Sequence, residues 1–187
     1  MSLRLLAADG TLAAWAPASP PTVVLRVEGP GARARAVSAA ARGALTFLGY
    51  EPAQGGGEPD LTVLLGPSTG EDCAYSEELH YLCLKTHPRK PLNVTREGLD
   101  AARRELLALK SSARSLAGVS LEPSSRGVTG YLHRFREALS RDFDFPEALS
   151  CVWDGLRPGA LSPGSKAALL RVALPALGLD GPLPGGS

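Results

Sequence analysis

The chain has 187 residues, 44% of them hydrophobic, and its 20 Lys and Arg against 19 Asp and Glu give a formal net charge of +1. That hydrophobic content is enough for a packed core in one domain or two small ones, which excludes wholesale disorder. The near-zero net charge excludes a protein that is basic all over, and no apolar run approaches the roughly 20 residues of a membrane helix.

The N-terminal part is predicted to hold strands around a single helix. Residues 3–6, 22–27 and 61–65 are apolar or β-branched runs, and the last two end at glycine and proline. Residues 32–48 are rich in alanine and arginine, which favours a helix, and Gly49 follows at the usual C-cap position. Residues 51–59 read as a loop. Strand, helix and strand in this order are typical of a parallel βαβ unit.

From Glu71 onward the pattern predicts only helices. Apolar residues recur at spacings of three and four, and Thr95 and Asp144 stand at good N-cap positions. Pro146 falls in a first helical turn, where its missing N–H costs little. A polar loop is expected at 118–126. The predicted helices cover residues 76–85, 96–116, 128–140, a segment beginning after Asp144, and 165–177. The fold class is therefore α/β plus α, a small parallel βαβ unit followed by an antiparallel bundle of about five helices.

The charges are unevenly distributed along the chain. Residues 51–84 hold seven acids and no Lys or Arg, whereas residues 85–141 hold twelve Lys and Arg against five acids, a net charge of +7. A basic helical segment is a candidate phosphate-binding face. The same net charge would also arise from a solvated helix surface whose charges serve only solubility. On charge alone, this second interpretation of residues 85–141 is slightly better.

The chain has three cysteines, Cys73, Cys83 and Cys151. The acidic residue Asp9 interrupts the start of the chain before the apolar segment of a signal peptide could be complete. Both features favour a reducing, cytoplasmic setting. Cys73, His80, Cys83 and His87 form the nearest approach to a metal-ligand cluster. Cys83 sits in an apolar run, which favours a core position. No metal and no cofactor are expected.

Two stretches resemble cysteinyl-tRNA synthetases. Residues 82–93 read LCLKTHPRKPLN and resemble the family's LLSTHYRSPLNF, and residues 135–149 read FREALSRDFDFPEAL and resemble FREALDDDFNTPEAL. Both motifs belong to the family's helical anticodon-binding bundle, of the DALR type, and they stand in the family's order. The resemblance covers about residues 76–179.

A weaker resemblance extends to the N-terminus. Residues 3–5, 27–30 and 44–50 resemble the first strand and helix of the family's catalytic Rossmann domain, a core that the mycothiol-pathway cysteine ligase shares as a related parent. The resemblance implies a truncated cysteinyl-tRNA synthetase-like protein. It divides the chain into a reduced Rossmann-like unit at 1–70, a DALR-like bundle at 71–179 and a disordered tail at 180–187.

The motifs that perform the family's chemistry are missing. No histidine follows Gly29 and Pro30, where the family has its HIGH-type motif, and the lysines of a KMSKS-type loop have no counterpart in residues 51–84. Glu28 stands where the family has its first zinc cysteine. Because adenylate formation needs cations on the developing pyrophosphate charge, no amino-acid activation is expected. Cysteine ligase activity is accordingly disfavoured, and the chain is predicted not to be an enzyme.

A non-catalytic tRNA- or RNA-binding paralogue is the leading functional hypothesis. Tyr131, Phe135 and Trp153 are expected in the core rather than stacked on bases. The candidate RNA-binding residues, all on the bundle, are Lys85, His87, Arg89, Lys90, Arg103, Arg104, Lys110, Arg114, Arg134, Arg136 and Arg141.

The alternative hypothesis is a protein-interaction or regulatory module, whose surfaces would be the acidic stretch 51–84 and the apolar last helix. A new enzymatic chemistry has no support, since the glycine triplet 55–57 lacks the G-x-G-x-x-G spacing of a phosphate loop. No membrane partner is expected.

Overall fold

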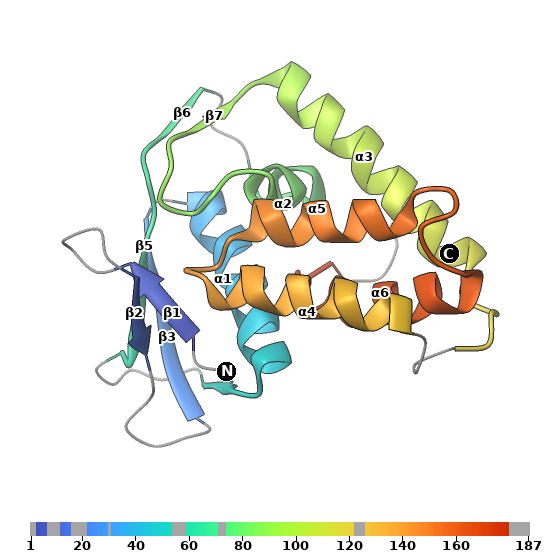
Figure 1. Ribbon diagram of the computed structural model, residues 1–187. Coiled ribbons are helices and arrows are strands. Elements are labelled where there is room, and N and C mark those ends of the chain that lie inside the picture. Colours follow the sequence, from blue (N-terminus) through green and yellow to red (C-terminus); the bar gives the residue numbers. More distant parts are fainter. Residues whose placement is uncertain are drawn as a thin grey trace.

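The computed structural model describes residues 3–6, 12–15, 22–29, 31–53, 59–70, 74–121 and 126–179. The predicted tail 180–187, the glycine triplet 55–57 and Cys73 lie outside these ranges. Short strands gather on one side of the molecule, and most of the helices lie together on the other (Figure 1). None of the described helices has the length and apolar character needed to cross a membrane.

A three-stranded parallel sheet forms the predicted βαβ unit. Its central strand is β3 (Thr22–Glu28), flanked by β4 (Glu51–Ala53) and β5 (Leu61–Leu64), and α1 (Gly31–Leu48) connects β3 to β4. The prediction of a loop over 51–59 was wrong for residues 51–53, which form strand β4. Its Pro52 is tolerated because β4 is an edge strand, where a missing N–H need not break a ladder. The sheet buries alternate residues, Val23, Leu25, Leu61 and Val63, in the common core.

Two further pairs of strands depart from the predictions. The strand predicted at 3–6 is present as β1 (Leu3–Leu6), but it pairs antiparallel with β2 (Leu12–Trp15) and is not part of the parallel sheet. Strand β6 (Ser68–Gly70) pairs in parallel with β7 (Leu92–Val94), so the prediction that no strand follows Glu71 was wrong. Each of β6 and β7 has only three residues, which is too short for a periodic pattern.

The five predicted helices are confirmed. They are α2 (Glu77–Leu84), α3 (Arg96–Ser115), α4 (Arg126–Ser140), α5 (Phe145–Leu156) and α6 (Pro163–Ala176). The side chains of Thr95 and Asp144 accept backbone N–H groups as expected, from Gly98 and Glu147. Helix α6 begins two residues earlier than predicted, because Ser162 is its N-cap.

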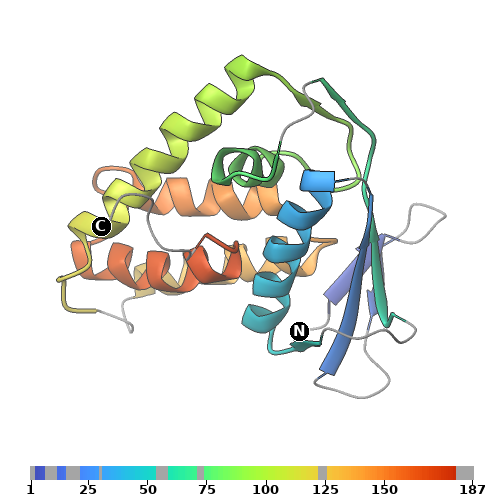
Figure 2. The same ribbon diagram turned by 180° about the vertical axis from the view of Figure 1, so that it is seen from behind.

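Helix α1 belongs to both halves of the fold. It covers the sheet through β3 and packs against α2 and α6 of the bundle (Figure 2). A methyl group at Gly43 would collide with the carbonyl oxygen of Pro175, so the backbones of α1 and α6 are in direct contact. Residues on both sides of the predicted boundary at residue 70 consequently share one continuous hydrophobic core.

Candidate nucleic-acid interface

The basic turn 85–90 after α2 is fixed to the sheet by a residue that the sequence did not single out. Arg33, in the first turn of α1, is buried, and its two terminal nitrogens donate to the carbonyl oxygens of Gly66, Pro67, Pro88 and Lys90 at 2.7–3.0 Å. Among the described residues its Nε has no hydrogen-bond partner, and burial lowers the pKa of Arg33. The carbonyls come from two distant segments, so no local pattern could have identified this contact.

The two motifs that carry the synthetase resemblance touch each other. Arg89 of the first motif donates two hydrogen bonds to Asp142 of the second, from Nε at 2.6 Å and from Nη2 at 2.9 Å. These bonds raise the pKa of Arg89. The carboxylate of Asp142 also lies 3.8 Å from Nε2 of His87, whose pKa is lowered because burial outweighs that nearby charge. The bidentate pair therefore joins the turn 85–90 to the connection between α4 and α5.

That connection has an unusual backbone. Asp142 and Phe143 have φ angles of 50° and 55°, a left-handed conformation that aspartate tolerates better than phenylalanine does. Phe143 stacks on Phe145 with ring centroids 5.9 Å apart, and both rings are buried. Stacking and the ion pair of Asp142 stabilise a turn that would otherwise be unfavourable.

Several of the other predicted residues are engaged within the fold. Lys110 is buried and its Nζ lies 2.5 Å from Oε1 of Glu77, so its ammonium group does not face solvent. Arg136 donates to the carbonyl of Phe47 at 3.1 Å and its guanidinium lies 5.0 Å from the centroid of that ring. Three exposed residues form ion pairs. Lys85 pairs with Glu105, and Arg103 pairs with Glu78. Arg134 pairs with both Glu147 and Asp154.

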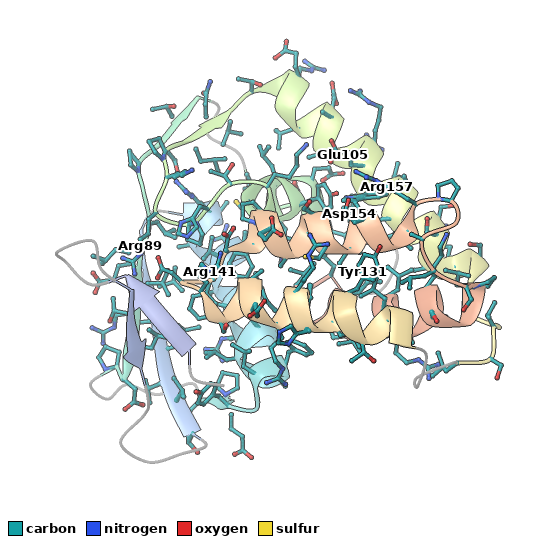
Figure 3. The ribbon with its side chains drawn as sticks, viewed as in Figure 1. Arg89, Glu105, Tyr131, Arg141, Asp154 and Arg157 are labelled. Atoms are coloured by element: carbon teal, nitrogen blue, oxygen red, sulfur yellow. The ribbon has the colours of Figure 1, made fainter. Side chains whose placement is uncertain are left out.

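Four predicted residues keep accessible positive charges. Among the described residues, no ion pair or hydrogen bond engages the exposed side chains of Lys90, Arg104, Arg114 and Arg141. Lys90 and Arg141 are the chain neighbours of the ion-paired residues Arg89 and Asp142. Figure 3 labels Arg89 and Arg141 at the end of the bundle that faces the strands. Arg104 and Arg114 lie on α3, about 15 Å apart at the usual helical rise. The eleven predicted residues thus do not form one surface but leave two pairs of free cations.

The aromatic residues of the bundle lie where they were expected. Phe135 is fully buried, and Tyr131 and Trp153 are partly buried against the hydrophobic clusters. The indole Nε1 of Trp153 donates to the hydroxyl of Tyr81 at 2.8 Å. The core interpretation of these rings is confirmed, which leaves the bundle's cations as its candidate contacts for nucleic acid.

Of the candidate metal ligands, His80 and Cys83 are buried, whereas Cys73 lies outside the described residues. His80 is buried, with Nε2 2.9 Å from the carbonyl of Leu177 and Nδ1 3.0 Å from the hydroxyl of Tyr75, and burial lowers its pKa. Nε2 therefore donates and the imidazole is neutral. Cys83 is a buried thiol. Within the described ranges no three His, Cys, Asp or Glu side chains converge as a metal site would require.

The structure defines an α/β plus α protein. Its small parallel sheet and its helical bundle share α1, and hydrogen bonds of Arg33 and Arg89 fix the basic turn 85–90. Comparison with known proteins makes this more specific. The chain is 38% identical over 79 residues to the cysteine–tRNA ligase of Thioalkalivibrio sulfidiphilus. The matched segment covers 42% of this chain and 16% of that protein. It is 35% identical over 107 residues to the cysteine–tRNA ligase of Methylococcus capsulatus, covering 54% of this chain and 23% of that protein.

The same similarity recurs with the cysteine–tRNA ligase of Nitrosococcus oceani, at 33% identity over 86 residues. No protein-family model matches the chain. The chain is therefore cysteinyl-tRNA synthetase-like, as the two sequence motifs predicted. The matches span between 16% and 23% of the length of these three relatives.

Proposed function

We propose that this chain is a non-catalytic, cysteinyl-tRNA synthetase-like protein whose helical bundle binds tRNA or another RNA. The observation that supports it best is the set of free, exposed cations on the bundle, namely Lys90, Arg104, Arg114 and Arg141. Phosphate groups are the ligands that such cations bind most readily, with little dependence on base sequence.

The turn that carries Lys90 favours this role because it is rigid. Arg33 holds the backbone of the turn from one side, and the pair of Arg89 with Asp142 holds it from the other. A cation on a fixed turn loses little conformational entropy when it meets a phosphate. Arg141 precedes Asp142 in the chain, so the same pair positions both cations.

The proposed absence of catalysis rests on the missing HIGH-type and KMSKS-type motifs, on the residue at the end of β3 and on the buried thiol of Cys151. Glu28 is exposed at the position where the resemblance implies a zinc-binding cysteine. Burial raises the pKa of the Cys151 thiol to about 11, so it is protonated and a poor nucleophile at neutral pH.

Binding of a labelled tRNA, followed by fluorescence anisotropy across a salt series, tests the proposal. Four phosphate contacts predict a slope of log affinity against log salt of roughly −3 to −4. Replacing Lys90 and Arg141 together with Glu should weaken binding at least about tenfold and make that slope shallower. Arg26→Glu, at an exposed arginine of β3, is the matched control and should leave binding unchanged.

Two results would contradict the proposal. Lack of tRNA and RNA binding at low salt would remove the nucleic-acid role. Cysteine-dependent exchange of pyrophosphate into ATP would show that the chain activates an amino acid and is an enzyme.

A further inference from the structure

Three hollows follow one another across the surface formed by α1, α6 and the end of α3. The first, of about 420 Å³, lies along α1 and shares Arg42 with the second, of about 530 Å³, between α1 and α6. The second shares Arg171 and Pro175 with the third, of about 310 Å³, between α6 and the end of α3. The three hollows adjoin one another, and we call the surface that they line the α6 furrow.

The charges along the α6 furrow are all positive. Arg35, Arg42 and Arg171 line it, and no Asp or Glu is among the described residues that do. Arg35 and Arg171 are exposed and Arg42 is half-buried, and within the described part of the chain none of the three side chains has an ion pair or hydrogen bond. Arg42 follows Arg35 by seven positions, which places the two about 10 Å apart on one face of α1.

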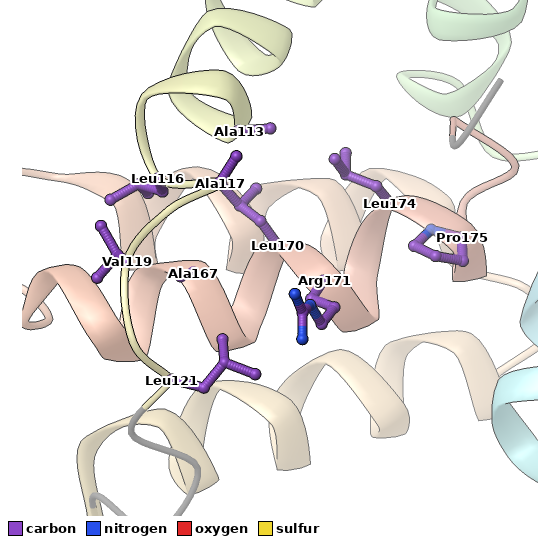
Figure 4. A pocket seen from close by; sticks show the side chains of 10 residues that line it. All are labelled: Ala113, Leu116, Ala117, Val119, Leu121, Ala167, Leu170, Arg171, Leu174 and Pro175. Carbon is purple, nitrogen blue, oxygen red and sulfur yellow. The ribbon is translucent and has the colours of Figure 1, made fainter. Parts of the chain in front are cut away.

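The end of the α6 furrow at α3 is apolar. Helix α3 packs mainly against α2, so its last turn stands away from α6 and leaves a hollow between them (Figure 4). Arg171 stands at the edge of this hollow, which is lined by Leu116, Val119, Leu121, Leu170 and Leu174 among others. A hollow of about 310 Å³ corresponds to roughly ten water molecules, enough for aliphatic side chains of a ligand.

We propose that the α6 furrow binds an acidic segment of a partner protein. Carboxylates of that segment would pair with Arg35, Arg42 and Arg171, and its aliphatic side chains would fill the hollow between α3 and α6. Charge complementarity carries the proposal, since arginines that have no acidic partner among the described residues attract carboxylates and orient them. None of the four cations proposed for RNA is among the residues that line the furrow.

A protein segment fits the α6 furrow better than RNA does. RNA bound along a groove of this kind gains affinity by stacking its bases on aromatic rings. Phe47 has the only aromatic ring among the described lining residues, and this ring lies under the guanidinium of Arg136 and packs edge-on against Phe135. Aliphatic walls instead offer apolar contact, which side chains of a peptide would supply.

Selection from a phage-displayed random peptide library against the whole chain tests the proposal. The selected peptides should be rich in Asp and Glu and in Leu, Ile or Val. Their affinity, measured by fluorescence anisotropy, should fall at least about fivefold on the double variant R42E/R171E, since each exposed pair contributes a few-fold. Ala117→Trp, which adds a ring at an exposed wall of the hollow, should also reduce it. Arg104→Glu is the control, because this exposed arginine lies outside the furrow.

The proposal is overturned if no acidic peptide is enriched, or if the selected peptides bind the double variant as well as the original chain. It is also overturned if R42E/R171E loses affinity for a labelled RNA while no peptide binding depends on these arginines, because the furrow would then follow a phosphate backbone. Thermal unfolding of each variant checks that the fold is retained. Arg104→Glu should weaken only RNA binding, which separates this proposal from the proposed function.

Discussion

Three cationic side chains join elements of the fold to one another. They are Arg33, Arg89 and Lys110. Arg33 binds backbone carbonyls of two loops, Arg89 binds Asp142, and Lys110 binds Glu77 at the start of α2. In each contact the charge is partly or fully removed from water, so loss of the partner is costly. At the scale of the residue, these cations stabilise the fold and are poorly placed to bind a ligand.

Replacing Arg89 with Ala should lower the free energy of unfolding by about 2 kcal/mol, because it leaves the carboxylate of Asp142 buried without its two charged donors. Urea denaturation measures the change. Lys90→Ala, at the exposed next residue, is the matched control and should change stability by no more than about 0.5 kcal/mol. Equal effects of the two substitutions would show that the bidentate pair does not stabilise the turn.

Elements whose signals are local were predictable, and those that depend on distant partners were not. Thr95 and Asp144 mark the starts of α3 and α5 within a few residues of sequence, and the structure places both caps there. Strand β7 has no such signal. It forms because the segment after Pro67 lies beside residues 92–94, and Arg33 ties Pro67 to Pro88 and Lys90 nearby.

The contact between α1 and α6 gives a test at the scale of the element. Gly43→Ala should destabilise the protein by about 2 kcal/mol, since the added methyl group overlaps the carbonyl of Pro175 and must push the helices apart. This reverses the usual effect of replacing glycine within a helix.

Gly130→Ala in α4 is the matched control, because nothing lies within 4 Å of a methyl group at that position. It should stabilise the protein by about 0.5–1 kcal/mol. Thermal or urea unfolding compares the two variants. Stabilisation by Gly43→Ala would mean that α1 and α6 do not meet as closely as described.

In the molecule as a whole, folding brings the end of the acidic stretch against the basic one. Glu77 and Glu78 of the acidic stretch lie against Lys110 and Arg103 of the basic one, because α2 packs along α3. A count by segment cannot anticipate this pairing, since it depends on which helix faces which. Of the eleven predicted residues, Arg103 and Lys110 pair with these acids, and the arginines of the proposed α6 furrow share no sequence signal because they come from α1 and α6.

The shared core predicts that the whole chain unfolds in one step. Helix α1 contacts the sheet on one side and α2 and α6 on the other, so neither part can lose its structure without exposing apolar surface of the other.

The two tryptophans report on different parts, Trp15 in β2 and Trp153 in α5. In variants that keep one tryptophan, made by Trp15→Phe or Trp153→Phe, fluorescence and circular dichroism should give coincident urea midpoints. A lower midpoint for Trp15 alone would place β1 and β2 outside the cooperative unit. Two widely separated transitions by circular dichroism would contradict a common core.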